Sequence, residues 1–138
     1  MSVTQISVFV ESRPGHLIHT LEIFTRHGIN VRGFSAADTG EYGIVRFVVD
    51  KPDEALSYLR EAGAAVQSSP VLCVKLEDKP GALESVLSVM ADNRINVVYC
   101  YSLMSTYIVL AVKNLAEAEE ALSRTELTLV DQSEISEL

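Results

Sequence analysis

The sequence predicts an α+β fold built from two tandem βαββαβ units, because three short blocks occur twice in one register. The blocks that align at a shift of 66 positions are Ile6–Glu11 with Leu72–Glu77, Arg13–Gly15 with Lys79–Gly81, and Ile29–Val31 with Ile95–Val97. Three matches separated by equal gaps indicate a duplicated unit. We expect a first domain at residues 1–69 and a second at residues 70–138.

The first unit shows the periodicities of a strand and then of a helix. Ile6, Val8 and Val10 recur at every second position, which is typical of a strand with one face on a core. Leu17 and Leu21 begin a helical face, and Pro14 suits the first turn of that helix. Gly28 is expected to close the helix in a left-handed conformation. Further strands are expected at 31–37, 44–49 and 64–68, with a helix over 52–62 that Asp50 caps.

The second unit repeats the pattern with small differences. Arg94 stands where the first unit has Gly28, so we expect a different turn there. Strands are expected at 72–76, 97–103, 107–112 and 127–131, with helices from Leu83 to Met90 and over 116–123, the latter capped by Asn114. Beyond the hairpin of each unit the shift falls to 64, which aligns Ile44-Val45 with Ile108-Val109 and Val66 with Val130.

Each unit therefore reads as a ferredoxin-like split βαβ arrangement, an antiparallel sheet with helices on one face. The strand over 108–112 is apolar on both faces, so both faces should be covered. We expect the second sheet to meet the first unit or another chain. We further expect the units to pair within the chain into one eight-stranded sheet with all helices on one side, and two chains to dimerise.

Composition excludes several classes of partner and site. The formal net charge of −8 disfavours nucleic acid and anionic membranes as partners. The N-terminus has no basic segment followed by an apolar run, and no stretch is long enough to span a membrane. Cys73 and Cys100 fit no disulfide framework or zinc spacing. We expect both to be buried free thiols in a cytoplasmic protein.

No residue pattern indicates catalysis, so we expect no enzyme activity, no cofactor and no metal. The sequence has no recognisable pairing of His with Cys or Ser, no phosphate-binding loop and no metal signature. His16 and His19 are three positions apart, but no further His or Cys cluster supports a metal site.

The order of these motifs resembles the ACT domain family. The shared elements are a strand, then Arg/Lys-Pro-Gly-x-Leu opening a helix, then Ile-Asn-Val opening the next strand, and they cover nearly the whole chain twice. The chain is most similar to tandem ACT proteins without an enzyme domain. The resemblance implies a non-catalytic regulatory protein that binds an amino acid, forms side-by-side ACT pairs with the ligand at the junction, and acts on a regulated enzyme.

Candidate ligand-binding residues follow from the Pro-Gly turns and the downstream Asn. They are Ser12, Arg13, Pro14, Gly15, His16, Leu17 and Asn30 in the first unit, and Asp78, Lys79, Pro80, Gly81, Ala82, Leu83 and Asn96 in the second. The glycines let a ligand approach the backbone, and the helix start supplies N–H groups suited to a carboxylate. The asparagine side chain offers both a hydrogen-bond donor and an acceptor.

Two alternatives stay open at this stage. The turns and asparagines can serve only the backbone, with Arg13 and Lys79 as solvated charges. The protein is then an interaction or oligomerisation module that has lost its ligand site. Even if ligand binds, the two sites should differ, because Ser12 and His16 are replaced by Asp78 and Ala82.

Overall fold

One long strand, β4 (Ala65–Lys75), joins the two units in the computed structural model, which describes residues 1–138. Its first part pairs with β1 and its last part with β6 and β7. The strands expected at 64–68 and 72–76 are therefore continuous, and the sheet has seven strands rather than eight. Pro70 lies in the middle of β4 and favours an extended backbone at Ser69. The strand contains no glycine that would favour a turn between the two units. The expected domain boundary at 69/70 lies inside this strand.

The remaining elements follow the expected order. In the first unit they are β1 (Val3–Glu11), α1 (His16–Arg26), β2 (Val31–Asp38), β3 (Tyr42–Val49) and α2 (Pro52–Glu61). In the second they are α3 (Ala82–Asp92), β5 (Val97–Ser102), β6 (Tyr107–Val112), α4 (Leu115–Ser123), β7 (Thr128–Val130) and α5 (Gln132–Ser136). The strand order is β2-β3-β1-β4-β6-β5, with β7 also pairing with β4. Each unit has the ferredoxin-like arrangement.

Strand pairing corrects the expected alignment of the units after their hairpins. Val8 of β1 lies opposite Val45, and its counterpart Val74 of β4 lies opposite Ile108. Val45 therefore corresponds to Ile108, at an offset of 63, and not to Val109. Helices α2 and α4, which begin at residues 52 and 115, have the same offset. The single residue matters because neighbouring side chains in a strand point to opposite faces.

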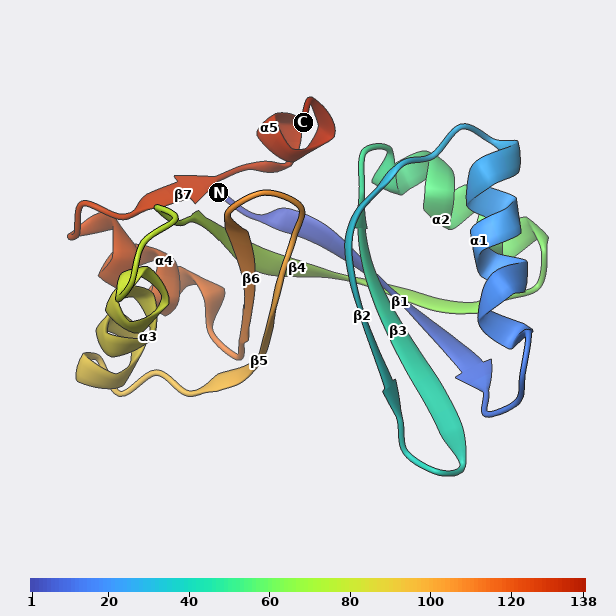
Figure 1. The fold of residues 1–138 in the computed structure, drawn as a ribbon, viewed down its shortest axis with the longest axis horizontal. Coiled ribbons are helices and arrows are strands. Elements are labelled where there is room, and N and C mark those ends of the chain that lie inside the picture. Colours follow the sequence, from blue (N-terminus) through green and yellow to red (C-terminus); the bar gives the residue numbers. More distant parts are fainter.

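Three apolar cores show how the two halves pack. Phe24, Phe47 and Leu59 are buried between the first sheet and its helices, and Met90 and Leu122 belong to the corresponding core of the second unit. A third core lies between the helix-free faces, with Val3, Val48, Val71, Val109 and Val130 among its members. Figure 1 shows α1 and α2 on one outer side and α3 and α4 on the other. The expectation that the second sheet meets the first unit is confirmed, whereas the expected single helical side is wrong.

A buried polar cluster crosses the third core. The Gln5 side chain is fully buried, and its amide donates to the Tyr99 hydroxyl at 2.6 Å. The Tyr101 hydroxyl donates to Gln5 Oε1 at 2.7 Å. The Arg46 guanidinium lies 4.0 Å from the centre of the Tyr99 ring. These contacts satisfy both ends of the buried amide and fix β1 of the first unit against β5 of the second.

The two units also touch at a backbone crossing. A Cβ added to Gly33 of β2 would lie 2.9 Å from Leu103 Cα. Beside it, the Met104 amide donates to the Arg32 carbonyl at 2.8 Å. Only glycine allows this close approach of β2 to the β5–β6 connection.

The C-terminal helix α5, which the sequence did not predict, contacts the first unit. Gln132 accepts from the Thr4 amide and donates to the Val49 carbonyl. Asp131 caps the helix by accepting from the Glu134 amide, and this hydrogen bond lowers the pKa of the Asp131 carboxyl. The helix thus holds the end of the second unit against β1 and β3.

Helix ends agree with the sequence in part. Gly28 and Arg94 both have positive φ, at 66° and 57°, so the two turns share one conformation where we expected a difference. Asn114 caps α4 by accepting from the Glu117 amide, as expected. Asp50, however, does not cap α2, because its carboxylate accepts from the Asn30 amide instead.

The two cysteines differ in exposure. Cys73 is buried, and burial raises the pKa of its thiol to about 12. Cys100 is exposed, contrary to expectation, because it lies on β5 at the edge of the sheet. No helix of this chain combines the length and the apolar character needed to cross a membrane.

Candidate functional site

The two Pro-Gly turns have the same backbone conformation. Gly15 has φ 84° and ψ −9°, and Gly81 has φ 88° and ψ −8°. Each glycine immediately precedes its helix, so Pro14 and Pro80 lie before the helix and not in its first turn as expected. A left-handed residue cannot continue a right-handed helix, which is why the helix begins one position later. A Cβ added at either glycine would meet nothing within 4 Å, so the space beside each turn is open.

Each turn holds an ion pair two residues apart. Arg13 Nε lies 3.1 Å from Glu11 Oε2, and Lys79 Nζ lies 2.8 Å from Glu77 Oε2. The hydrogen bond and charge of Lys79 lower the pKa of the Glu77 carboxyl. All four side chains are well exposed, so the pairs are weakly held. Each turn therefore presents a positive and a negative group side by side to solvent.

Contacts specific to the first turn bind it to neighbouring segments. The Ser12 hydroxyl donates to Asp38 Oδ2 at 2.6 Å, and this hydrogen bond is the main reason the pKa of Asp38 is lowered. The Glu11 amide donates to His16 Nδ1 at 3.0 Å. His16 Nε2 is left available to a ligand. Asp78 and Ala82 occupy the positions of Ser12 and His16 in the second turn, without equivalent contacts.

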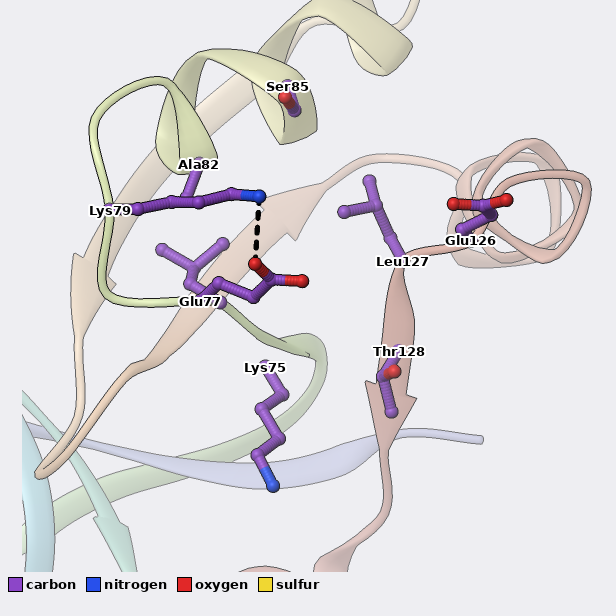
Figure 2. A pocket seen from close by; sticks show the side chains of 9 residues that line it. Lys75, Glu77, Lys79, Ala82, Ser85, Glu126, Leu127 and Thr128 are labelled. Atoms are coloured by element: carbon purple, nitrogen blue, oxygen red, sulfur yellow. Dashed lines mark ion pairs between the residues drawn. The ribbon is translucent and has the colours of Figure 1, made fainter.

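A hollow of about 470 Å³ borders each turn, on the side of the second crossover helix. The second-unit hollow is shown in Figure 2 and is lined by Lys75, Leu76, Glu77, Lys79, Ala82, Ser85, Glu126, Leu127 and Thr128. The first-unit hollow contains the counterparts Phe9, Val10, Glu11, His16, His19, Gly63, Ala64 and Ala65. At offsets of 66 before the hairpin and 63 after it, eight of the nine residues correspond. The exception is Lys79, because its counterpart Arg13 does not line the first-unit hollow. The duplication has therefore placed a hollow at the corresponding position of each unit.

The first turn borders another hollow on its opposite side. This hollow measures about 450 Å³ and lies between the turn and the end of β2, where Ala36, Ala37 and Asp38 line it. Arg13, Pro14 and the partly buried Leu17 also border it. The first turn is thus accessible from both sides.

The two asparagines lie away from the turns of their own units. Asn30 and Asn96 are exposed and precede β2 and β5, beyond the far ends of α1 and α3. Each helix has 11 residues, so the separation along its axis is roughly 16 Å. Figure 1 shows the β1–α1 turn and the α1–β2 connection at opposite ends of α1. Within one unit, the structure does not bring Asn and turn together.

Several residues at the turns were missed from the sequence. Glu11 and Glu77 pair with the expected cations, and their repetition at aligned positions was the signal that could have found them. Phe9 and Tyr42 gave no such signal, because only folding brings the hairpin tip beside β1. No group of three or more His, Cys, Asp or Glu side chains is arranged to hold a metal ion.

A family model for the ACT domain pair matches residues 1–138. The chain belongs to this family. Among solved structures, protein BT0572 from Bacteroides thetaiotaomicron is similar over 100% of this ACT domain pair and 98% of its own chain, with 27% identity and a TM-score of 0.94. The resemblance given by the sequence motifs is therefore confirmed.

Two aspartate kinase regulatory subunits share the fold. The Thermus thermophilus subunit, in a ligand-free form, has 20% identity and a TM-score of 0.63, with 87% of each chain covered. The Thermus flavus subunit has 17% identity and a TM-score of 0.58, covering 88% of this chain and 90% of its own. No curated protein matches the chain.

Proposed function

We propose that this ACT domain pair is a non-catalytic regulatory protein that binds an amino acid at its two Pro-Gly turns. The observation that carries the proposal is the repeated turn itself. In each unit an open left-handed glycine stands beside a Glu and an Arg or Lys. The cation suits the carboxylate of an amino acid, and the Glu suits its ammonium group. The first N–H groups of α1 and α3, which have no side-chain cap, favour the same carboxylate.

Regulation of a partner enzyme is part of this proposal. Two proteins that share the fold are regulatory subunits of aspartate kinase. At this low identity the similarity shows a shared fold only. A regulatory role for this chain is therefore part of our proposal, and we name no partner enzyme. We assign no catalytic residue, cofactor or metal, and we place the protein in the cytoplasm, consistent with its two free cysteines.

Pairing of two chains would complete the proposed site. Ile18 and Leu21 of α1 and Phe34 of β2 are exposed apolar side chains on one edge of the first unit, and the folded chain leaves them uncovered. In a symmetric dimer that aligns two α1 helices antiparallel, Asn30 of one chain lies beside the Pro-Gly turn of the other. This arrangement accounts for the separation of Asn30 and Gly15 within one chain, and it makes the ligand site a junction of two ACT units.

Calorimetric titration of the full chain with each common amino acid tests the proposal. We expect at least one to bind with a dissociation constant in the millimolar range or below. Combining Arg13→Gln with Lys79→Gln should weaken that binding roughly tenfold or more, because each removes a charge-assisted contact. Lys113→Gln is the matched control, because Lys113 is an exposed cation that follows β6, at the end of this strand away from Tyr107, which pairs with Lys75 near the second turn.

Two results would contradict the proposal. Binding that survives the double substitution would place the site elsewhere. A chain that binds no amino acid at millimolar concentration, yet still forms dimers by light scattering, would instead be an interaction module without a ligand site.

A further inference from the structure

We propose that the first-unit hollow accepts the side chain of an amino acid with a large apolar side chain, and that the second-unit hollow rejects it. This inference rests on the proposed function, because it assumes that the ligand's ammonium and carboxylate groups lie at the turn. It adds the chemical class of the ligand and assigns the two turns different specificities.

The charged side chains of the two turns correspond in kind. Glu11 with Arg13, and Glu77 with Lys79, stand at corresponding positions on identical backbone turns. Glu11 and Glu77 each border the hollow of their unit, and Lys79 does so too, whereas Arg13 lines the hollow on the other side of its turn. In both units a zwitterion would have one Glu and one cation at the turn, so the walls of the two hollows decide which side chain is accepted.

The wall of the first-unit hollow carries two aromatic rings among apolar and polar side chains. The rings of Phe9 and Tyr42 lie 6.3 Å apart at an angle of 49°, and the two residues are 38% and 43% exposed. Ile23 and Ala64 add apolar surface, and the polar part of the wall consists of Glu11, His16, His19, Thr20 and Glu41. Partly exposed aromatic rings at the border of a 470 Å³ hollow gain from covering by an apolar side chain.

The wall of the second-unit hollow carries charges at the corresponding positions. Lys75 replaces Phe9, and Glu126 replaces Gly63. Figure 2 shows Lys75 and Lys79 on opposite sides of Glu77, with Glu126 across the hollow near Leu127. An apolar side chain entering here would remove water from the Lys75 ammonium and the Glu126 carboxylate without replacing their hydrogen bonds. The second hollow therefore disfavours the ligand that the first accepts.

Exchange of the two walls tests this inference by stoichiometry. Calorimetry with L-phenylalanine and L-leucine is carried out on the full chain, on Phe9→Lys, and on Lys75→Phe combined with Glu126→Gly. We expect one equivalent of at least one probe per wild-type chain, a loss of roughly tenfold in affinity in Phe9→Lys, and a second equivalent in the double variant. Met104→Lys is the control, because Met104 is exposed at 61% and lines neither hollow.

Circular dichroism and thermal unfolding show that each variant is folded before it is titrated. If other amino acids bind at the turns but neither apolar probe does, the inference is wrong and the proposed function stands. Two equivalents in the wild type, or unchanged affinity in folded Phe9→Lys, also overturn the inference alone. If no amino acid of any class binds, both the inference and the proposed function are wrong.

Discussion

Replacing Gln5 by Leu should loosen the contact between the two ACT units. Gln5 is fully buried, and its side-chain amide satisfies the hydroxyls of Tyr99 and Tyr101 across the third core. Leu has a similar volume but no polar atom, so both hydroxyls lose a partner. Burial also raises the pKa of the Tyr101 hydroxyl, so this group cannot adapt by ionising at neutral pH.

The size of the effect follows from the two orphaned hydroxyls. An unpaired buried polar group costs about 1–3 kcal/mol, and both tyrosines are only partly buried, so the lower half of that range applies to each. We expect the free energy of unfolding to fall by about 2–4 kcal/mol. For a chain of 138 residues this lowers Tm by roughly 7–14 °C.

Urea unfolding of a small variant series measures this change. Gln5→Leu is compared with a triple variant that adds Tyr99→Phe and Tyr101→Phe. The triple variant has no orphaned hydroxyl and keeps an aromatic ring beneath Arg46, so it should recover most of the lost stability. A triple variant as unstable as Gln5→Leu would refute the reasoning, because the loss would then come from packing and not from unpaired hydroxyls.

Three further predictions concern single positions. Gly33→Ala should lower the free energy of unfolding by about 1–3 kcal/mol in urea, because the new Cβ meets the Leu103 backbone; an unchanged midpoint would contradict this crossing. Arg94→Gly should raise that free energy by roughly 1 kcal/mol, because φ is 57° there; a destabilised variant would contradict it. At pH 8 a thiol reagent should modify Cys100 rapidly and Cys73 only after unfolding, since burial raises the pKa of Cys73 to about 12; equal rates in the folded protein would contradict the buried position.

Local patterns predicted most of the fold. Alternating apolar residues located the strands of each unit, and helical spacing located α1 to α4, because these periodicities reflect burial on one face. The alignment of the halves failed by one residue after the hairpins. Sequence identity between Ile44-Val45 and Ile108-Val109 favoured an offset of 64, whereas strand pairing requires 63. Side-chain identity cannot decide this when both faces of a strand are apolar.

The packing of the two units depended on contacts distant in sequence. The apolar second face of β6 predicted a cover, and that cover is the first unit. Nothing local to β4 indicated that it continues through Pro70, nor that Gln5 would pair with tyrosines more than 90 positions away. Arrangement of the units is set by such tertiary contacts and by the strand that both share.

The candidate site was predicted in composition more than in geometry. The open glycines and adjacent cations of both turns lie as the motif suggested. The motif also grouped Asn30 with the turn, although an 11-residue helix separates them in the structure. A sequence motif shows which residues recur, but it does not show whether these residues lie close together within one chain or only between two chains.

The most direct test of amino acid binding is a titration followed by two-dimensional amide NMR spectra of the full chain. An amino acid that binds at the turns should shift the amide signals of Gly15 and Gly81 and of the first residues of α1 and α3. The signal of Gly33, which lies at the crossing of β2 and the β5–β6 connection and lines neither hollow, should move far less. Shifts concentrated elsewhere in the chain, or none at saturating ligand, would contradict the proposed site.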